Sequence, residues 1–269
     1  METALVSEVM VGRLAPRRGD RLAALDLGTN NCRLLVAEVR SDGCEVVDSF
    51  SRIVRLGEGL AATGRLGDTA MARTIAALKV CARLLARHRI VSARCVATEA
   101  CRRAANGPEF LRRVERTTGL SLEVLPQEEE ARLAMLGCLP LLDDDAEQCL
   151  MVDIGGGSTE VMWLDRRQPV GGVEPGAAVS LPLGVVTLSE TFGGELDGAR
   201  YGRMVEHVAA RLESVGLPSG LPSASPRVQM LGTSGTVTTL AAVHLGLRRY
   251  DRRKVDGLTL PFSAIETVS

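Results

Sequence analysis

The sequence predicts an α/β protein made of two related halves, and three features carry this prediction. Residues 21–56 contain three extended apolar runs separated by turn residues, which is typical of an antiparallel strand meander. Residues 68–139 then alternate between helical and extended patterns, as expected of an α/β chain. Finally, the apolar-Asp-apolar-Gly pattern of Leu25–Gly28 recurs at Val152–Gly155 in the same strand-turn-strand context.

The first half contains most of the predicted elements. Its strands are expected at 22–25, 32–39, 45–56, 93–97 and 120–125, and its helices at 68–89, 99–105, 108–118 and 127–139. The helix at 68–89 has the clearest pattern. Met71, Ile75 and Leu78 recur at helical spacing, and Asp68 stands where it can cap the first turn.

The second half follows an acidic connector at Asp143–Glu147. Its strands are expected at 149–154, 160–164, 178–183 and 228–231, its helices at 198–215 and 237–245, and a Pro/Ser-rich loop at 217–226. A further helix opens at 260–266, so we expect the second domain to continue beyond Ser269. The predicted organisation is a flexible leader (1–20), a first domain (21–127) and a second domain (128–269).

Composition excludes several classes of function. The chain is 45% hydrophobic, which supplies enough apolar surface for folded cores. Aromatic residues make up only 3%, so a platform of stacked rings for single-stranded nucleic acid has little material. The formal net charge of −1 argues against a surface devoted to a polyanion. Any phosphate site must therefore be a local arrangement of positive groups.

Cysteine and histidine usage indicates a reducing compartment without a zinc site. The seven cysteines form no C-x-x-C pair, and the three histidines are far apart in the sequence. Near the N-terminus, the basic cluster follows the apolar stretch, which is the reverse of a secretory signal. No run approaches the roughly 18 apolar residues of a membrane span. We therefore expect a cytoplasmic protein.

The most distinctive motif is the stretch Asp153–Glu160, which contains three consecutive glycines. Such glycines weaken strand pairing and leave room for an anion to approach the backbone. Ser158 and Thr159 add hydroxyl donors, while Asp153 and Glu160 are hard oxygen ligands suited to Mg²⁺. The alternative is a flexible glycine loop with incidental acidic residues.

Two further turns carry candidate phosphate-binding groups. Asp26–Asn30 places a carboxylate at a strand end before a glycine turn, although an ordinary hairpin with an Asx-type turn explains the same residues. Gly232–Thr236 lies between a predicted strand and helix, so the N–H groups of Gly232, Ser234 and Gly235 would face a phosphate or nucleotide. The alternative there is simple helix capping.

Charged residues near the predicted junction of the halves are less distinctive. Glu128, Glu129 and Glu130 begin a helix, where the dipole favours acidic residues in any case. A glutamate at this position could nevertheless serve as a general base for water. Arg102 and Arg103 follow a strand and could reach a phosphate, but surface arginines explain them equally well.

Taken together, these motifs resemble the exopolyphosphatase/guanosine pentaphosphate phosphohydrolase family, within the superfamily of actin, sugar kinases and heat-shock ATPases. The resemblance runs from about Leu22 to the end of the chain. It is carried by Asp26–Asn30, Arg52–Leu60, Ala97–Arg102, Glu129–Arg132, Asp153–Glu160 and Leu231–Thr239. It implies two actin-like (ribonuclease H-like) domains, each a mixed sheet flanked by helices, with the active site in an interdomain cleft.

The resemblance also implies roles for single residues. Glu130 would be the catalytic base, Arg102 would contact phosphate, and Asp153 and Glu160 would hold Mg²⁺ or order the water. The remaining implied phosphate-binding residues are Thr29, Asn30, Gly155, Gly156, Gly157 and Ser158. Thr29 departs from the family pattern, in which serine is commoner. Arg103 matches no family position.

The implied reaction is release of terminal orthophosphate from inorganic polyphosphate or guanosine pentaphosphate with Mg²⁺. We expect no DNA or membrane partner, and a homodimer is left open. Two alternatives remain. An actin-like kinase or ATPase would share both glycine turns, and a non-catalytic sensor would bind polyphosphate or guanosine tetraphosphate without turnover.

Overall fold

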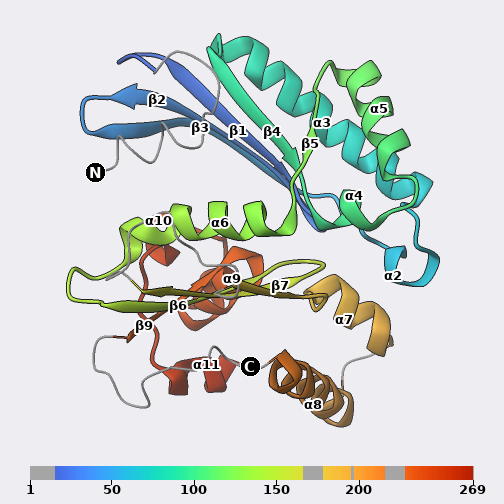
Figure 1. Cartoon of the computed structure of the whole chain (residues 1–269), viewed down its shortest axis with the longest axis vertical. Coiled ribbons are helices and arrows are strands. Elements are labelled where there is room, and N and C mark those ends of the chain that lie inside the picture. Colours follow the sequence, from blue (N-terminus) through green and yellow to red (C-terminus); the bar gives the residue numbers. More distant parts are fainter. Residues whose placement is uncertain (1–15, 166–177, 195–196, 216–227, 269) are drawn as a thin grey trace. The chain divides into compact units, whose positions relative to one another are not determined.

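The computed structural model describes residues 16–165, 178–194, 197–215 and 228–268 (Figure 1). The chain divides into two compact units, Met1–Glu130 and Ala131–Ser269. The division falls inside helix α6 (Gln127–Cys138), close to the domain boundary expected at 127/128. Most of the expected leader lies outside the described residues. Of its last residues, Gly19 donates its N–H to the carbonyl of Val39 at 2.9 Å.

The first unit is built on a five-stranded mixed sheet (Figure 1). Its strands are β1 (Arg21–Leu27), β2 (Asn31–Arg40), β3 (Gly43–Ile53), β4 (Ser92–Ala97) and β5 (Glu123–Val124), in the order β3-β2-β1-β4-β5. Strands β1, β2 and β3 pair antiparallel, which confirms the predicted meander, and β4 pairs parallel to β1. Crossover helices return the chain between the parallel strands, as in other α/β folds.

The helices of this unit are α2 (Leu60–Thr63), α3 (Asp68–His88), α4 (Glu99–Arg103), α5 (Gly107–Thr118) and the start of α6. Helix α3 packs on β1 and β2, and α5 packs on α3 (Figure 1). Asp68 lies in the first turn of α3 and basic Arg87 and His88 lie in its last, which suits the helix dipole. Leu78 of α3 and Phe110 of α5 are fully buried in a core with the sheet.

The second unit contains a four-stranded mixed sheet. Its strands are β6 (Gln148–Ile154), β7 (Thr159–Asp165), β8 (Ala178–Leu181) and β9 (Val228–Thr233), in the order β8-β7-β6-β9. Its further helices are η1 (Leu139–Leu141), α7 (Val185–Phe192), α8 (Gly198–Val215), α9 (Ser234–His244), α10 (Arg252–Val255) and α11 (Phe262–Val268). A small core joins α6 to the sheet through Met135, Met151 and Met162.

Both units repeat one strand topology, which confirms the predicted internal relationship. In the second sheet, β6, β7 and β8 pair antiparallel in sequence order and β9 pairs parallel to β6. Strands β1, β2, β3 and β4 have the same arrangement in the first. In this correspondence Asp26 on β1 matches Asp153 on β6, because each stands one residue before the final residue of its strand.

Several predicted elements need correction. The strand expected at 120–125 is only the two-residue β5, because β5 pairs only with Val96 and Ala97 at the end of β4. Helix α9 begins at Ser234, earlier than expected. Helix α7 was not predicted, since its opening β-branched run Val185-Val186-Thr187 has low helix propensity. The loop expected at 217–226 lies outside the described residues.

Within the described parts of the chain, no helix has the length and apolar character needed to cross a bilayer.

Candidate active site

Each unit carries the same four-residue turn between its first two strands. In the first unit, Leu27 and Cys32 are the last paired residues, and Gly28 donates its N–H to the Asn31 carbonyl at 2.9 Å. In the second unit, Ile154 pairs with Thr159. The turn between them, 155–158, closes with the same bond at 2.9 Å, from the Gly155 N–H to the Ser158 carbonyl. The two predicted glycine turns are thus structurally equivalent.

The first turn is held by the segment that follows β3. The carbonyl of Asn30 accepts the N–H groups of Val54 at 2.8 Å and Arg55 at 3.0 Å, and that of Thr29 accepts the Gly57 N–H at 3.0 Å. A Cβ on Gly57 would clash with the Thr29 methyl group. Thr29 is only 7% exposed. The glycine-bearing segment 52–60 therefore fixes the turn in which the two predicted phosphate-binding residues lie.

The second turn is held in the same way, by the start of α7. Val185 and Val186 donate their N–H groups to the carbonyls of Gly155 and Gly156, at 3.2 and 2.8 Å. A Cβ on Gly184 would clash with the backbone of Gly156. Position 184 therefore needs a glycine, since two backbones meet there. In the turn itself, Ser158 is buried.

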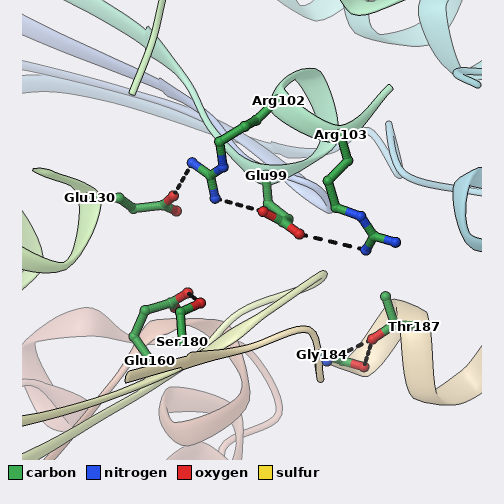
Figure 2. Close-up of polar contacts among 8 residues, drawn as sticks. All are labelled: Glu99, Arg102, Arg103, Glu130, Glu160, Ser180, Gly184 and Thr187. Carbon is green, nitrogen blue, oxygen red and sulfur yellow. Dashed lines mark hydrogen bonds and ion pairs between the residues drawn. The ribbon is translucent and has the colours of Figure 1, made fainter. Parts of the chain in front are cut away.

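The predicted metal ligands of the second unit lie directly opposite each other. Asp153 on β6 and Glu160 on β7 are cross-strand partners, and such partners point to the same face of a sheet. Glu160 is only 5% exposed and accepts a hydrogen bond from the Ser180 hydroxyl at 2.7 Å (Figure 2). Two carboxylates opposite each other repel, and a bound cation would remove that repulsion. Their oxygen donors fit Mg²⁺.

No group of three or more His, Cys, Asp or Glu residues that could hold a metal is found in the described ranges. A two-carboxylate site is still sufficient for Mg²⁺, which commonly keeps several waters and takes its remaining ligands from substrate phosphates.

The equivalent position of the first unit has a different charge. Asp26 faces Arg33 across β1 and β2, so an acid-base pair replaces the two acids of the second unit. Burial raises the pKa of the Asp26 carboxyl, and the positive charge of Arg33 opposes part of this rise. Because the charges of Asp26 and Arg33 offset each other, this pair attracts a cation less strongly than the Asp153 and Glu160 pair of the second unit does.

The three glutamates at the start of α6 have different surroundings. Glu128 is exposed. Oε1 of Glu129 lies 3.3 Å from Nη1 of Arg94. Oε2 of Glu130 lies 3.0 Å from Nη1 of Arg102 (Figure 2). The structure thus brings together the predicted base and the predicted phosphate-binding arginine.

Arg102 is held by two further contacts. Its Nη1 donates to the Leu125 carbonyl at 2.7 Å, and its Nη2 lies 2.6 Å from Oε2 of Glu99. Helix α4, which carries both residues, follows Thr98, whose N–H bonds to the carbonyl of Leu27 at 3.1 Å. Leu27 immediately precedes the first glycine turn. The start of helix α4, which carries Arg102, is therefore hydrogen-bonded to the residue just before the first glycine turn, within the same unit.

The third predicted phosphate loop has a strained backbone. Ser234, at the junction of β9 and α9, has a φ of 74°, which is rare for a residue other than glycine. Such strain is concentrated at functional sites. A Cβ on Gly232 would lie 2.7 Å from Cγ1 of Val237, so this glycine is also needed for packing. Gly235 follows in the first turn of α9, and phosphate contact by these residues remains a prediction.

The sequence of the chain is similar to those of known proteins. The family model described as the Ppx/GppA phosphatase family matches residues 35–253. The chain belongs to the Ppx/GppA phosphatase family. It is 35% identical over 242 residues to Exopolyphosphatase 2 of Mycobacterium tuberculosis, and this match covers 86% of the chain and 73% of that protein.

Solved structures of related proteins have the same fold as this chain. A crystal structure of the Aquifex aeolicus family member matches at a TM-score of 0.70 and 33% identity, covering 92% of this chain and 77% of that one. An exopolyphosphatase-like protein matches at a TM-score of 0.82 and 33% identity, with 94% and 77% covered. The predicted pair of actin-like α/β domains is confirmed, while the interdomain cleft between their loops stays a prediction.

Three residues of this Ppx/GppA site were not predicted from the sequence. Glu99 holds Arg102, Ser180 holds Glu160, and Gly184 supports the second glycine turn. Of these, only Glu99 left a local signal, because it precedes Arg102 by one helical turn. The other two contacts depend on strand register and on a turn between distant segments.

Proposed function

We propose that this chain hydrolyses the terminal phosphoanhydride of inorganic polyphosphate and releases orthophosphate. The observation that carries the proposal is the contact at 3.0 Å between Glu130 and Arg102. A carboxylate able to take a proton from water stands there next to a guanidinium able to bind a phosphoryl group. The similarity to Exopolyphosphatase 2 supports polyphosphate as the substrate.

In the proposed reaction, a water oxygen attacks the terminal phosphorus. The bond from that phosphorus to the bridging oxygen breaks, and the shortened chain leaves with its negative charge. Glu130 accepts a proton from the attacking water, while Arg102 stabilises charge on the phosphoryl oxygens. Thr29 and Asn30 in the first unit, and the turn Gly155–Ser158 in the second, would each donate to phosphate oxygens. Gly232, Ser234 and Gly235 would bind phosphate at the third loop.

We further propose that Asp153 and Glu160 hold Mg²⁺. Their opposed carboxylates in adjacent strands supply hard oxygen ligands and two negative charges. When bound, Mg²⁺ would offset the negative charge of the phosphate oxygens. Ser180 would keep the Glu160 carboxylate oriented whether or not the cation is present.

Guanosine pentaphosphate is a second candidate substrate, because the family description names GppA beside Ppx and both substrates present a terminal anhydride. Transfer of phosphate to an acceptor, as in a kinase, and binding without turnover are the other outcomes to separate.

The test is orthophosphate release by the chain from long-chain polyphosphate and from guanosine pentaphosphate, each with Mg²⁺ and with a chelator. We expect Mg²⁺-dependent release from polyphosphate, with guanosine pentaphosphate acting as a competitor if it shares the site. Tight polyphosphate binding with no orthophosphate release would contradict the proposal and favour a sensor. Production of ADP from ATP with a phosphorylated acceptor would favour a kinase.

A further inference from the structure

Glu99 stands at the centre of the charged network around the proposed base. Its Oε2 lies 2.6 Å from Nη2 of Arg102, and its Oε1 lies 3.6 Å from Nη1 of Arg103 (Figure 2). Arg102 in turn reaches Glu130 through its other terminal nitrogen. The carboxylates of Glu99 and Glu130 therefore share one guanidinium, one at each nitrogen.

The carboxylate of Glu99 is the less accessible of the two. The Glu99 side chain is 12% exposed, compared with 23% for Glu130 and 21% for Arg102. A carboxylate with so little access to water is costly unless it is paired, so its contact with Arg102 is strongly favoured. The pair is also local, because both residues lie in α4, three positions apart. The contact between Glu99 and Arg102 is therefore the one that holds the guanidinium in place.

Arg102 makes two contacts that do not involve the proposed base. Glu99 holds Nη2, and the Leu125 carbonyl accepts from Nη1 at 2.7 Å. Glu130 shares Nη1 at 3.0 Å, the longest of the three distances. A terminal phosphate carries more negative charge than a carboxylate and presents several acceptor oxygens. It can thus compete for Nη1 while the other two contacts keep the guanidinium in place.

We infer that Glu99 is a positioning residue, which anchors Arg102 while its guanidinium exchanges Glu130 for the terminal phosphate of the substrate. The inference rests on the proposed function. In the structure described here, the positive charge beside Glu130 weakens it as a base. Substrate binding draws that charge toward phosphate and makes the carboxylate a better proton acceptor. Glu99 prevents Arg102 from following Glu130 when the phosphate binds.

The charges around Glu130 predict that its pKa shifts in opposite directions when Glu99 or Arg102 is replaced by a neutral residue. Arg102 faces it from α4, Glu99 stands behind Arg102, and Glu129 paired with Arg94 lies next to it on α6. Removing the negative charge of Glu99 lowers the pKa of Glu130, whereas removing the positive charge of Arg102 raises it. General destabilisation of the unit would not move the two values in opposite directions.

The experiment compares Glu99→Gln, Arg102→Gln and the control Arg103→Gln. Arg103 contacts the same carboxylate, but its side chain is 41% exposed. Two quantities are measured: binding of tripolyphosphate by calorimetry, and the pH dependence of kcat/KM for orthophosphate release from polyphosphate. Thermal melting establishes that each variant is folded.

We expect Glu99→Gln to weaken tripolyphosphate binding roughly 10-fold, as for loss of a hydrogen bond between charged groups. Its acidic limb of kcat/KM should move to lower pH by about half a unit or more, and that of Arg102→Gln to higher pH. Arg103→Gln should stay within about twofold of wild type, since exposed ion pairs contribute little. Glu99→Asp, which keeps the charge, should recover part of the binding.

Wild-type binding and an unmoved acidic limb in folded Glu99→Gln would overturn the inference. Limbs that move in the same direction in Glu99→Gln and Arg102→Gln would overturn it too. If Glu99→Gln does not fold, Glu99→Asp carries the comparison, because its shorter side chain reaches Arg102 less well. If Glu99→Asp then binds tripolyphosphate as tightly as wild type, after correction for any unfolded protein, the result would count against anchoring. A wild-type chain that binds tripolyphosphate without releasing orthophosphate defeats the proposed function, while the binding comparison still decides the role of Glu99.

Discussion

Nη1 of Arg102 lies 3.0 Å from Oε2 of Glu130 and 2.7 Å from the carbonyl oxygen of Leu125. One nitrogen thus links the proposed base to the backbone just before α6. Because the helix begins at Gln127, this contact fixes the first turn of α6 to helix α4. The orientation of Glu130 therefore depends on a planar group with several donors, and a single point charge could not replace it.

Replacing Arg102 by lysine tests this dependence on shape. An ammonium group keeps the charge but cannot reach Glu99, Leu125 and Glu130 from one fixed plane. We expect kcat/KM for orthophosphate release to fall about 10- to 100-fold, corresponding to one or two lost charge-assisted hydrogen bonds. The matched control is Arg94→Lys, which alters the pairing with Glu129. Equal losses in the two variants would contradict a special role for Arg102.

The two opposed carboxylates of the second unit predict an unusual response to substitution. Glu160→Gln removes a like-charge pair with Asp153 and keeps an acceptor for the Ser180 hydroxyl. Without Mg²⁺ we expect this variant to be as stable as wild type or more stable, by about 0.2–1 kcal/mol. Mg²⁺ should raise the melting temperature of wild type but not of the variant. The same Mg²⁺-induced rise in both proteins would argue against this site.

Gly184 is predicted to be intolerant of a side chain. An alanine Cβ would clash with the backbone of Gly156, so Gly184→Ala should reduce the free energy of unfolding by about 1–3 kcal/mol and lower activity. Gly202 in α8 is the control, because a Cβ there meets no atom within 4 Å. Gly202→Ala should stabilise by about 0.5–1 kcal/mol. Urea unfolding measures both, and similar effects of the two substitutions would refute the packing argument.

The raised pKa of Asp26 gives a pH-dependent prediction. Burial raises this pKa above its unfolded value, so the ionised carboxyl destabilises the folded chain once pH exceeds that unfolded value near 4. The penalty grows until pH passes the folded pKa. Asp26→Asn removes it, and the gain in unfolding free energy over wild type should be larger at about pH 8 than at about pH 4. A gain that shrinks as pH rises would have the wrong sign.

The sequence predicted the elements that depend on local patterns. Alternating apolar residues and glycine turns placed the two hairpins, and the repeated Asp26 and Asp153 motifs predicted their equivalence. The helix at 68–89 was confirmed almost to the residue, because its apolar spacing and charged ends agree. Helix α7 was missed because its β-branched start is stabilised by bonds from Val185 and Val186 to the glycine turn, which no local pattern reveals.

The site could be predicted by residue type but not by contact. Glu130 was singled out through a family resemblance, while the structure separates it from Glu128 and Glu129 by its pairing with Arg102. That pairing joins positions 28 residues apart, so it follows from the fold and not from spacing. Gly184 was unpredictable for a similar reason, because its role appears only when the backbone of Gly156 is brought against it.

In the proposed reaction, Glu130 activates the attacking water. The most direct measurement is kcat for orthophosphate release from polyphosphate by Glu130→Gln, with Glu129→Gln as the control that removes a neighbouring ion-paired carboxylate. We predict a fall of about 10²- to 10⁴-fold for Glu130→Gln, as for loss of a general base, and a change within about twofold for Glu129→Gln. Undiminished kcat in folded Glu130→Gln would contradict the claim.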